Sequence, residues 1–266
     1  AAVFPIQARA ATPAIYVADR DLTYPARSRC ASPDYLTAGG YASDDEPMQD
    51  AIDEAGNGGM VVLCPGFYAL FDELTIPAGN NLTFAGLSAA TTLIDGNNAH
   101  RAFNASPTGE DDEGGTLTLR NLSIEFTWVD DLELGGAVLA DSVVLDGMVI
   151  SGSQNAYNGG AVYAEGNITV RNSTIAFNDA SEDGGAIYAW SNSSHTSITN
   201  SVFESNGAGN VGGAISAAGT LSVTMSTFAN NSAESDGGAI KTNRSIDVRA
   251  STFDNNSTSN GRGGAI

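Results

Sequence analysis

The sequence has very little positive charge. Its 266 residues include 11 Lys and Arg against 31 Asp and Glu, a formal net charge of −20, and Lys241 is the single lysine. Nucleic-acid binding depends on clusters of Lys and Arg that neutralise phosphates, so we expect no nucleic-acid partner. The same charge disfavours an anionic membrane surface.

Long apolar runs and metal-binding residues are also missing. No run approaches the roughly 20 residues of a membrane span, so we expect no transmembrane segment. The only histidines are His100 and His195, and no Cys/His cluster has metal-binding spacing, so we predict neither a metal site nor a cofactor. The two cysteines, Cys30 and Cys64, favour one disulfide in an oxidising compartment, with two buried thiols as the alternative.

Helical periodicity is confined to one segment, residues 43–55. Ser43 and Glu46 have the spacing of a capping box, and Gly56 follows as a stop. The apolar face comprises Met48, Ala51, Ile52 and Ala55. We predict a short helix that covers the open apolar end of a repeat array, because solenoids need such caps.

What the sequence has instead is a repeat. The tripeptide Gly-Gly-Ala begins at Gly135, Gly159, Gly184, Gly212, Gly237 and Gly263, at intervals of 24, 25, 28, 25 and 26 residues. A Val or Ile follows each copy. Short runs alternate apolar and small residues, which predicts strands, and Gly, Asn and Ser between them predict turns. A coil of about 25 residues built this way is one rung of a parallel β-helix.

Other columns keep the same register. One column holds Ile150, Ile175, Phe203, Phe228 and Phe253, and three residues later come Ser153, Asn178, Asn206, Asn231 and Asn256. In a parallel β-helix, equivalent residues of successive coils stack on one another. We therefore expect an interior ridge of Val and Ile side chains and a ladder of Asn side-chain amides at a turn. Each Asn can tolerate a left-handed backbone there. These columns therefore have a structural explanation, and we assign them no binding role.

The paired motifs Gly-Gly-Ala-Ile and Phe-x-x-Asn resemble the repeats of the polymorphic outer-membrane proteins and related bacterial β-helical adhesins. The early coils depart from the pattern, with Ile150 and Ile175 in place of Phe and Ser153 in place of Asn. The resemblance implies a secreted or cell-surface protein with a right-handed β-helix used for adhesion or as a stalk. The segment from Gln49 to Gly96 also resembles the opening of pectin-lyase-like β-helix proteins, a superfamily with both enzymes and adhesins.

We therefore predict an all-β chain with a single right-handed parallel β-helix and an N-terminal helical cap. Residues 1–59 form the lead-in and capping helix, residues 60–134 irregular coils, and residues 135–266 regular repeat coils, all in one continuous domain. The chain stops at Ile266, directly after a Gly-Gly-Ala, so we expect further coils to continue it or a partner to cover the last rung.

Three aromatic residues are the candidate binding site. If Ile187 points inward, alternation places Tyr188 and Trp190 outward, with Tyr163 one rung below Tyr188. Flat aromatics on a rigid ladder can stack on sugar rings, which suggests carbohydrate recognition. The expected partner is a glycan or protein on a host surface or in the extracellular space. The alternative is ordinary edge packing under a neighbouring loop.

Enzymatic function is the second hypothesis, as a polysaccharide lyase or hydrolase, and a cell-envelope assembly role is the third. Asp183 and Asp236 share the column before Gly-Gly two rungs apart, about 9.6 Å, a spacing compatible with an inverting carboxylate pair. Acidic residues are also ordinary in turns, so we assign no catalytic residue and lean towards a non-enzyme. The acidic loop Glu110–Glu113 would at most hold calcium loosely.

Overall fold

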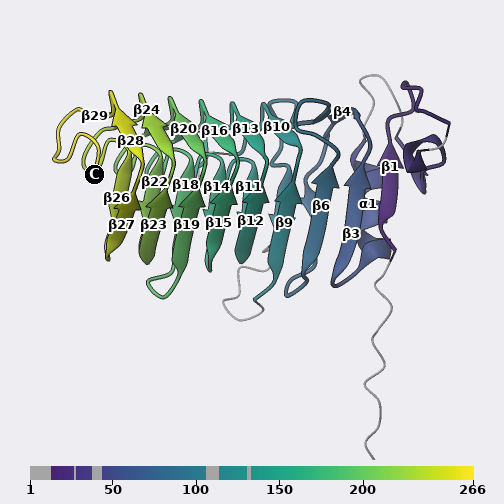
Figure 1. Ribbon diagram of the computed structural model, residues 1–266, viewed down its shortest axis with the longest axis horizontal. Coiled ribbons are helices and arrows are strands. Elements are labelled where there is room, and N and C mark those ends of the chain that lie inside the picture. The colour runs from purple at the N-terminus through teal and green to yellow at the C-terminus, as the bar shows by residue number, and fades with distance from the viewer. Residues whose placement is uncertain (1–12, 27, 38–43, 106–113, 131–132) are drawn as a thin grey trace, which may run out of the picture.

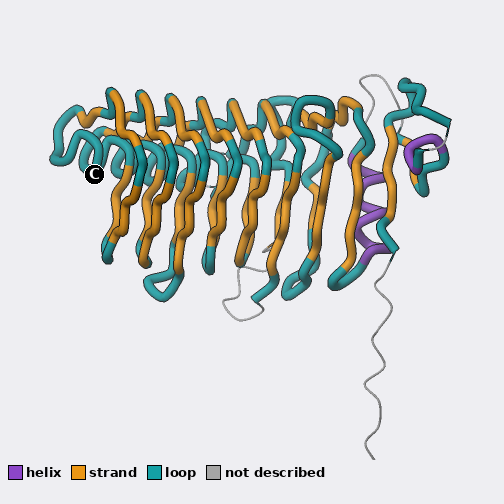
Figure 2. The backbone as a smooth tube through the Cα atoms, viewed as in Figure 1, coloured by secondary structure: helices purple, strands orange, loops and turns teal. Residues whose placement is uncertain are grey.

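Parallel strands stack into a solenoid. The computed structural model describes residues 13–26, 28–37, 44–105, 114–130 and 133–266. The chain winds through about eight turns of about 25 residues, and successive coils follow one another along the long axis of the molecule (Figure 1). Strands recur at the same place in each coil and loops occupy the corners (Figure 2). The predicted parallel β-helix is therefore confirmed.

Four parallel sheets form the walls of the solenoid. The ten-stranded sheet has the order β2 (Tyr35–Leu36), β1 (Ile15–Ala18), β3 (Gly59–Leu63), β6 (Leu82–Gly86), β9 (Thr116–Arg120), β12 (Ser142–Asp146), β15 (Ile168–Arg171), β19 (His195–Thr199), β23 (Thr220–Thr224) and β27 (Ile246–Arg249). The eight-stranded sheet has the order β28 (Thr252–Asp254), β24 (Thr227–Ala229), β20 (Val202–Glu204), β16 (Thr174–Ala176), β13 (Val149–Ser151), β10 (Ser123–Glu125), β7 (Thr92–Asp95) and β4 (Gly66–Ala69). The seven-stranded sheet has the order β26 (Ile240–Thr242), β22 (Ile215–Ala217), β18 (Ile187–Ala189), β14 (Val162–Ala164), β11 (Val138–Ala140), β8 (Phe103–Ala105) and β5 (Leu74–Thr75). The four-stranded sheet has the order β17 (Asp179–Ala180), β21 (Gly207–Ala208), β25 (Ser232–Ala233) and β29 (Ser257–Thr258).

The register stacks like residues on like residues, as predicted. In the seven-stranded sheet the residue after each Gly-Gly-Ala pairs with its counterpart one coil away, in the order Val138, Val162, Ile187, Ile215 and Ile240. All five side chains are fully buried. Burial of each one contributes about 1.5–3 kcal/mol, so the ridge couples every coil to its neighbours.

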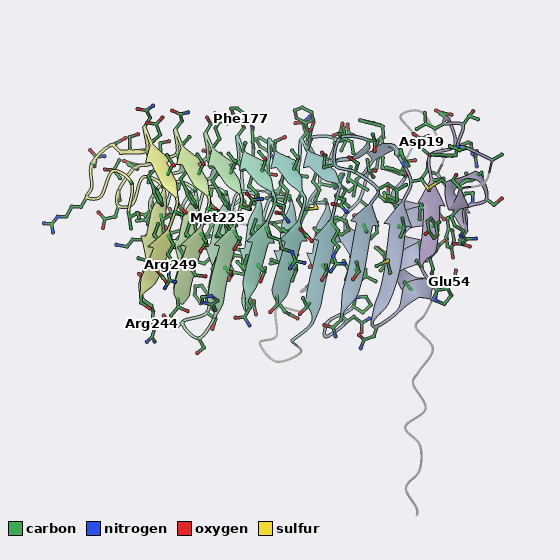
Figure 3. All side chains as sticks on the ribbon, viewed as in Figure 1. Asp19, Glu54, Phe177, Met225, Arg244 and Arg249 are labelled. Atoms are coloured by element: carbon green, nitrogen blue, oxygen red, sulfur yellow. A yellow bond between two sulfur atoms is a disulfide. The ribbon has the colours of Figure 1, made fainter. Side chains whose placement is uncertain are left out.

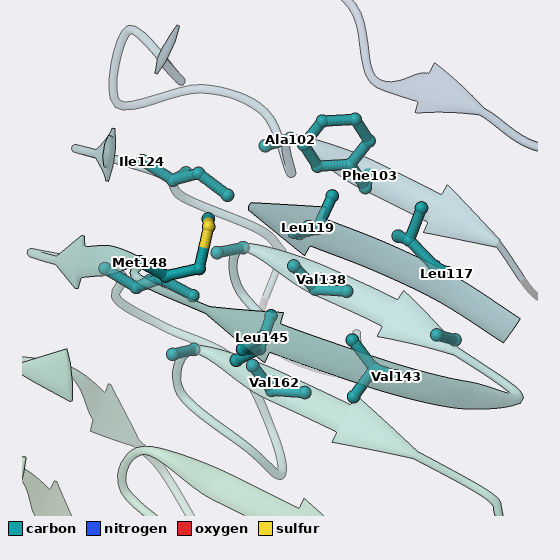
Figure 4. Packing of buried hydrophobic residues seen from close by; sticks show 14 of the residues in the cluster. Ala102, Phe103, Leu117, Leu119, Ile124, Val138, Val143, Leu145, Met148 and Val162 are labelled. Atoms are coloured by element: carbon teal, nitrogen blue, oxygen red, sulfur yellow. The ribbon is translucent and has the colours of Figure 1, made fainter. Parts of the chain in front are cut away.

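The core is one continuous apolar column enclosed by the sheets. Figure 4 shows how side chains from different sheets meet inside it: Val143 and Leu145 from β12, Val138 from β11, and Ile124 from β10. Further along the axis the rings of Phe203, Phe228 and Phe253 stack with centroids 4.9 Å apart. The Phe of the Phe-x-x-Asn motif is therefore a core residue.

The predicted Asn ladder is present, with one correction. Asn206 accepts hydrogen bonds at Oδ1 from the backbone N–H and the side-chain Nδ2 of Asn178, and its own Nδ2 donates to Asn231 Oδ1 and to the carbonyl of Ile175. The ladder continues from Asn231 to Asn256. The left-handed backbone, however, lies one residue earlier in each coil, at Phe177, Ser205, Asn230 and Asn255. That residue makes the bend, which leaves the following Asn free to turn its amide into the coil.

The Gly-Gly pair has two different physical causes. Gly237 has φ +65°, a conformation that L side chains rarely adopt. A Cβ on Gly238 would collide with the carbonyl oxygen of Gly264 in the next coil. The first glycine therefore makes the turn, and the second allows close backbone packing.

The helical cap is confirmed, although it starts later than predicted. Helix α1 (Asp45–Ala55) buries Met48, Ala51, Ile52 and Ala55 against the first coils and ends at Gly56 with φ 59°. Asp44 takes the N-cap position and binds the backbone of Ala69 instead of the helix, and Ser43 lies outside the described residues. Within the described ranges no helix has the length and apolar character needed to cross a membrane.

A disulfide fastens the lead-in to the solenoid. Cys30, in the short 3-10 helix η1 (Arg29–Ala31), is bonded to Cys64 at the end of β3, with 5.7 Å between the Cα atoms. The predicted pairing is therefore confirmed. Strands β4 and β5 are separated by a bend at Phe71, whose N–H donates to Asp45 in α1.

Candidate functional site

The three predicted aromatics lie together on the outer face of the seven-stranded sheet. Tyr163 in β14 pairs in register with Tyr188 in β18, and their rings stack with centroids 5.5 Å apart and planes 22° apart. Trp190 follows β18, and its ring centroid lies 6.2 Å from that of Tyr188. The structure therefore brings all three residues into one cluster.

Their exposure differs from one residue to the next. Trp190 is 55% exposed, Tyr188 is half-buried, and Tyr163 is only 5% exposed. Tyr163 can therefore support the ring of Tyr188 but offers little of its own face to a ligand. The accessible part of the cluster is Trp190 with one edge of Tyr188.

These two rings border a hollow of about 420 Å³. The other lining residues are Ser191, Asn192, Ser193, Ala218 and Asn243. Burial, followed by the charge of Asp183, raises the pKa of Tyr188, so its hydroxyl stays protonated at neutral pH and can donate a hydrogen bond. We call this the aromatic hollow: two aromatic faces beside small, uncharged polar groups.

The polar half of the hollow was not predicted. Residues 190–194 form the loop between β18 and β19, and internal bonds hold it: Ser194 donates to the carbonyl of Ser191, whose Oγ accepts from the N–H of Ser193. The sequence carried a signal, since the coil from Gly184 to Gly212 is the longest, at 28 residues. A lengthened coil in a regular array is where an extra loop must sit.

The two aspartates of the enzymatic hypothesis each accept a hydrogen bond from the corresponding turn of the next coil. Asp183 accepts a hydrogen bond from Asn210, and burial raises its pKa. Asp236 accepts from the N–H of Arg262 and pairs with Lys241 at 3.2 Å, contacts that lower its pKa. Neither lines the aromatic hollow. Their column stacks as predicted, but its side chains have structural partners.

A second cavity, of about 640 Å³, lies over the earlier coils around Arg101. Arg101 is 5% exposed, and its guanidinium binds Glu73 at 2.7 Å and Glu133 at 2.9 Å. We call this the Arg101 cleft; sequence reasoning missed it because its residues come from three coils without a shared motif. Among the described residues no group of Asp, Glu, His and Cys is arranged to hold a metal ion, and the acidic loop Glu110–Glu113 lies outside them.

Comparison with known protein families finds similarity over a short stretch of the chain. The family model described as the Chlamydia polymorphic membrane protein repeat matches residues 226–243. This stretch contains Phe228, Asn231 and Gly237 to Ile240, one copy of each motif. No curated protein and no solved structure matches the chain. The chain therefore carries a polymorphic membrane protein repeat within a parallel β-solenoid, and the matched residues are those that build the coil.

Proposed function

We propose that this protein is a cell-surface β-solenoid that binds glycans through the aromatic hollow. The match to the polymorphic membrane protein repeat supports exposure at the outer membrane or cell surface. The disulfide supports an oxidising compartment. An adhesin-like role follows from a rigid array that presents a binding site on its side.

The observation that carries the proposal is the exposed indole face of Trp190 beside Tyr188 and uncharged polar groups. Aromatic rings offer large, rigid contact area at low entropic cost, and a sugar's apolar ring face can lie on them. The loop of residues 191–193 and Asn243 supplies hydroxyl and amide groups that can pair with sugar hydroxyls. No charged side chain lines the hollow, so a neutral sugar fits it best.

Binding accounts for the geometry better than the two alternatives. Polysaccharide cleavage rested on Asp183 and Asp236, and both side chains already have partners, Asn210 and Lys241. A cell-envelope assembly role explains the solenoid but gives no reason for an exposed tryptophan beside a lined hollow. We therefore place recognition first, and cleavage and assembly behind it.

A glycan array tests the proposal. We expect the intact protein to bind a subset of neutral glycans, and Trp190→Ala to weaken that binding about tenfold, because a lost stacking contact costs roughly 1 kcal/mol or more. Phe177→Ala is the matched control, since Phe177, labelled in Figure 3, is also an exposed aromatic but lies between β16 and β17 and does not line the hollow. An unchanged array signal for Trp190→Ala, or an equal loss for Phe177→Ala, would rule the hollow out.

A further inference from the structure

The Arg101 cleft exists because neighbouring coils have unequal connections. Between β7 and β8 the chain has seven residues, 96–102, whereas between β10 and β11 it has twelve, 126–137. The longer connection contributes Trp128, Val129, Asp130 and Glu133 to one wall, and the shorter one contributes His100 and Arg101. The same two connections also contribute Ala99 and Leu134, and the rest of the described lining is Asp72 and Glu73 at one corner, Asn104 in β8 and Leu139 in β11.

The cleft has an excess of negative charge. Among the described lining residues, carboxylates come from Asp72, Glu73, Asp130 and Glu133, and the guanidinium of Arg101 is the one positive group. That guanidinium is already occupied, because it binds both glutamates and the carbonyl oxygens of Leu134 and Gly135. These described carboxylates and the guanidinium sum to a formal charge of −3, and Arg101 has little capacity left for an anion. An anionic ligand is therefore repelled.

One side of the cleft is apolar. Trp128 is 39% exposed, and the half-buried Leu139 and the mostly buried Val129 line the same cleft. An indole face attracts a cation that sits above it, and aliphatic neighbours favour a methylene stem. The ligand that satisfies both sides has an apolar stem and a positively charged head.

We propose that the Arg101 cleft binds a lysine or arginine side chain of a partner polypeptide. The stem lies along Trp128 and Leu139, and the charged head reaches the carboxylates of Asp72 and Asp130. A bare divalent cation does not fit, because the carboxylates of the described residues form no metal-binding group. An amino sugar would press hydroxyl groups against Val129 and Leu139, where they would lack partners.

This site is separate from the aromatic hollow, since the two cavities share no lining residue. It gives the protein a polypeptide partner in addition to a glycan. The net charge of −20 would also speed the approach of a basic partner.

Tryptophan fluorescence tests the proposal directly. The Trp190→Phe protein retains Trp128 as its single tryptophan, so its emission reports on the cleft. We would titrate it with the pentapeptides Gly-Gly-X-Gly-Gly, in which X is Lys, Arg, norleucine or Glu. We expect a saturable change with the Lys and Arg peptides that weakens as salt rises, and none with norleucine or Glu.

Two further variants locate the binding. Asp130→Asn removes one charge from an exposed position of the cleft and should weaken Lys-peptide binding at least threefold with an unchanged melting temperature. Asp254→Asn removes the same charge from an exposed position in β28, at the far end of the solenoid, and should change binding less than twofold. Equal effects of the two variants would mean that the net charge of the whole protein attracts the peptide, and not the cleft. Equal binding of the norleucine peptide would mean that the positive charge of the ligand is not recognised. Either result overturns this proposal and leaves the glycan proposal standing, because the array reads a different cavity.

Discussion

At the scale of single residues, the Asn ladder shows most clearly how one side chain holds two coils. Asn206 is fully enclosed and uses both its amide oxygen and its amide nitrogen, as the ladder contacts above show. Asn206→Ala would leave the backbone N–H of Asn178 without its acceptor inside the solenoid. The Nδ2 group of Asn178 would keep only its 3.3 Å contact with the carbonyl of Ile150. We expect a loss of about 2–4 kcal/mol in the free energy of unfolding, measured by chemical denaturation.

The control for that measurement is Asn260→Ala. Asn260 is exposed and makes one long side-chain contact, 3.4 Å to Glu234. Its replacement should change stability by less than about 0.5 kcal/mol. If the two variants lose equal stability, the ladder adds nothing beyond an ordinary surface amide.

At the scale of elements, regular coils were predictable and irregular ones were not. The repeated Gly-Gly-Ala, Phe and Asn positions indicate which residues of neighbouring coils pair with one another, because stacked coils repeat the same environment at each position. The bend at Phe71 had no such column, since a contact with Asp45 of α1, 26 residues earlier, fixes it. Packing that repeats from coil to coil produces a periodic sequence pattern and can be predicted from it. A single contact between distant residues produces no such pattern.

The same distinction applies to the sites. Outward aromatics at 163, 188 and 190 follow from strand alternation, so the cluster was predictable. That Tyr163 is buried while Trp190 stays exposed depends on what lies over each ring, which alternation does not specify. The Arg101 cleft depends on a difference in length between two connections and on ion pairs that join residues 28 and 32 positions apart. Only the folded coils bring those charges together.

The capping helix makes a testable prediction at this scale. Ile52 of α1 is 2% exposed and packs into the core at the N-terminal end of the solenoid. Ile52→Ala should cost about 2–5 kcal/mol, because a cavity remains where the side chain was removed. In a linear array that loss should appear first as faster amide hydrogen exchange in β1 and β3, with β23 unaffected.

Asp50→Ala is the comparison, since Asp50 lies on the exposed side of the same helix. It removes a side chain from solvent and keeps the buried face intact. Faster exchange in β1 and β3 for this variant too would mean that helix formation, and not burial of Ile52, controls the end of the array.

At the scale of the whole molecule, a solenoid transmits stability only between neighbours. Each coil contacts the one before and the one after, so stability is a sum of coil terms and interface terms. Ile215 lies between Ile187 and Ile240 in the interior ridge and is fully buried. Ile215→Asp would place an unpaired charge in the core, a change that costs about 4–5 kcal/mol or more. We expect the single unfolding transition to split, with the coils around β22 melting first and those before β11 later, as followed by hydrogen exchange along the chain.

The choice of control for this experiment depends on the structure. Alternation alone suggests the adjacent, outward Ser216, but Ser216 is only 6% exposed, with Tyr188 and Lys241 on the neighbouring rungs, so an added charge there would also be confined. Ser232 in β25 is exposed, and Ser232→Asp adds the same charge at the surface. It should leave one transition with a midpoint close to that of the unchanged protein. If Ile215→Asp also keeps one unshifted transition, position 215 does not face the core and the inward assignment of the whole ridge is wrong, because the register ties each member to the next.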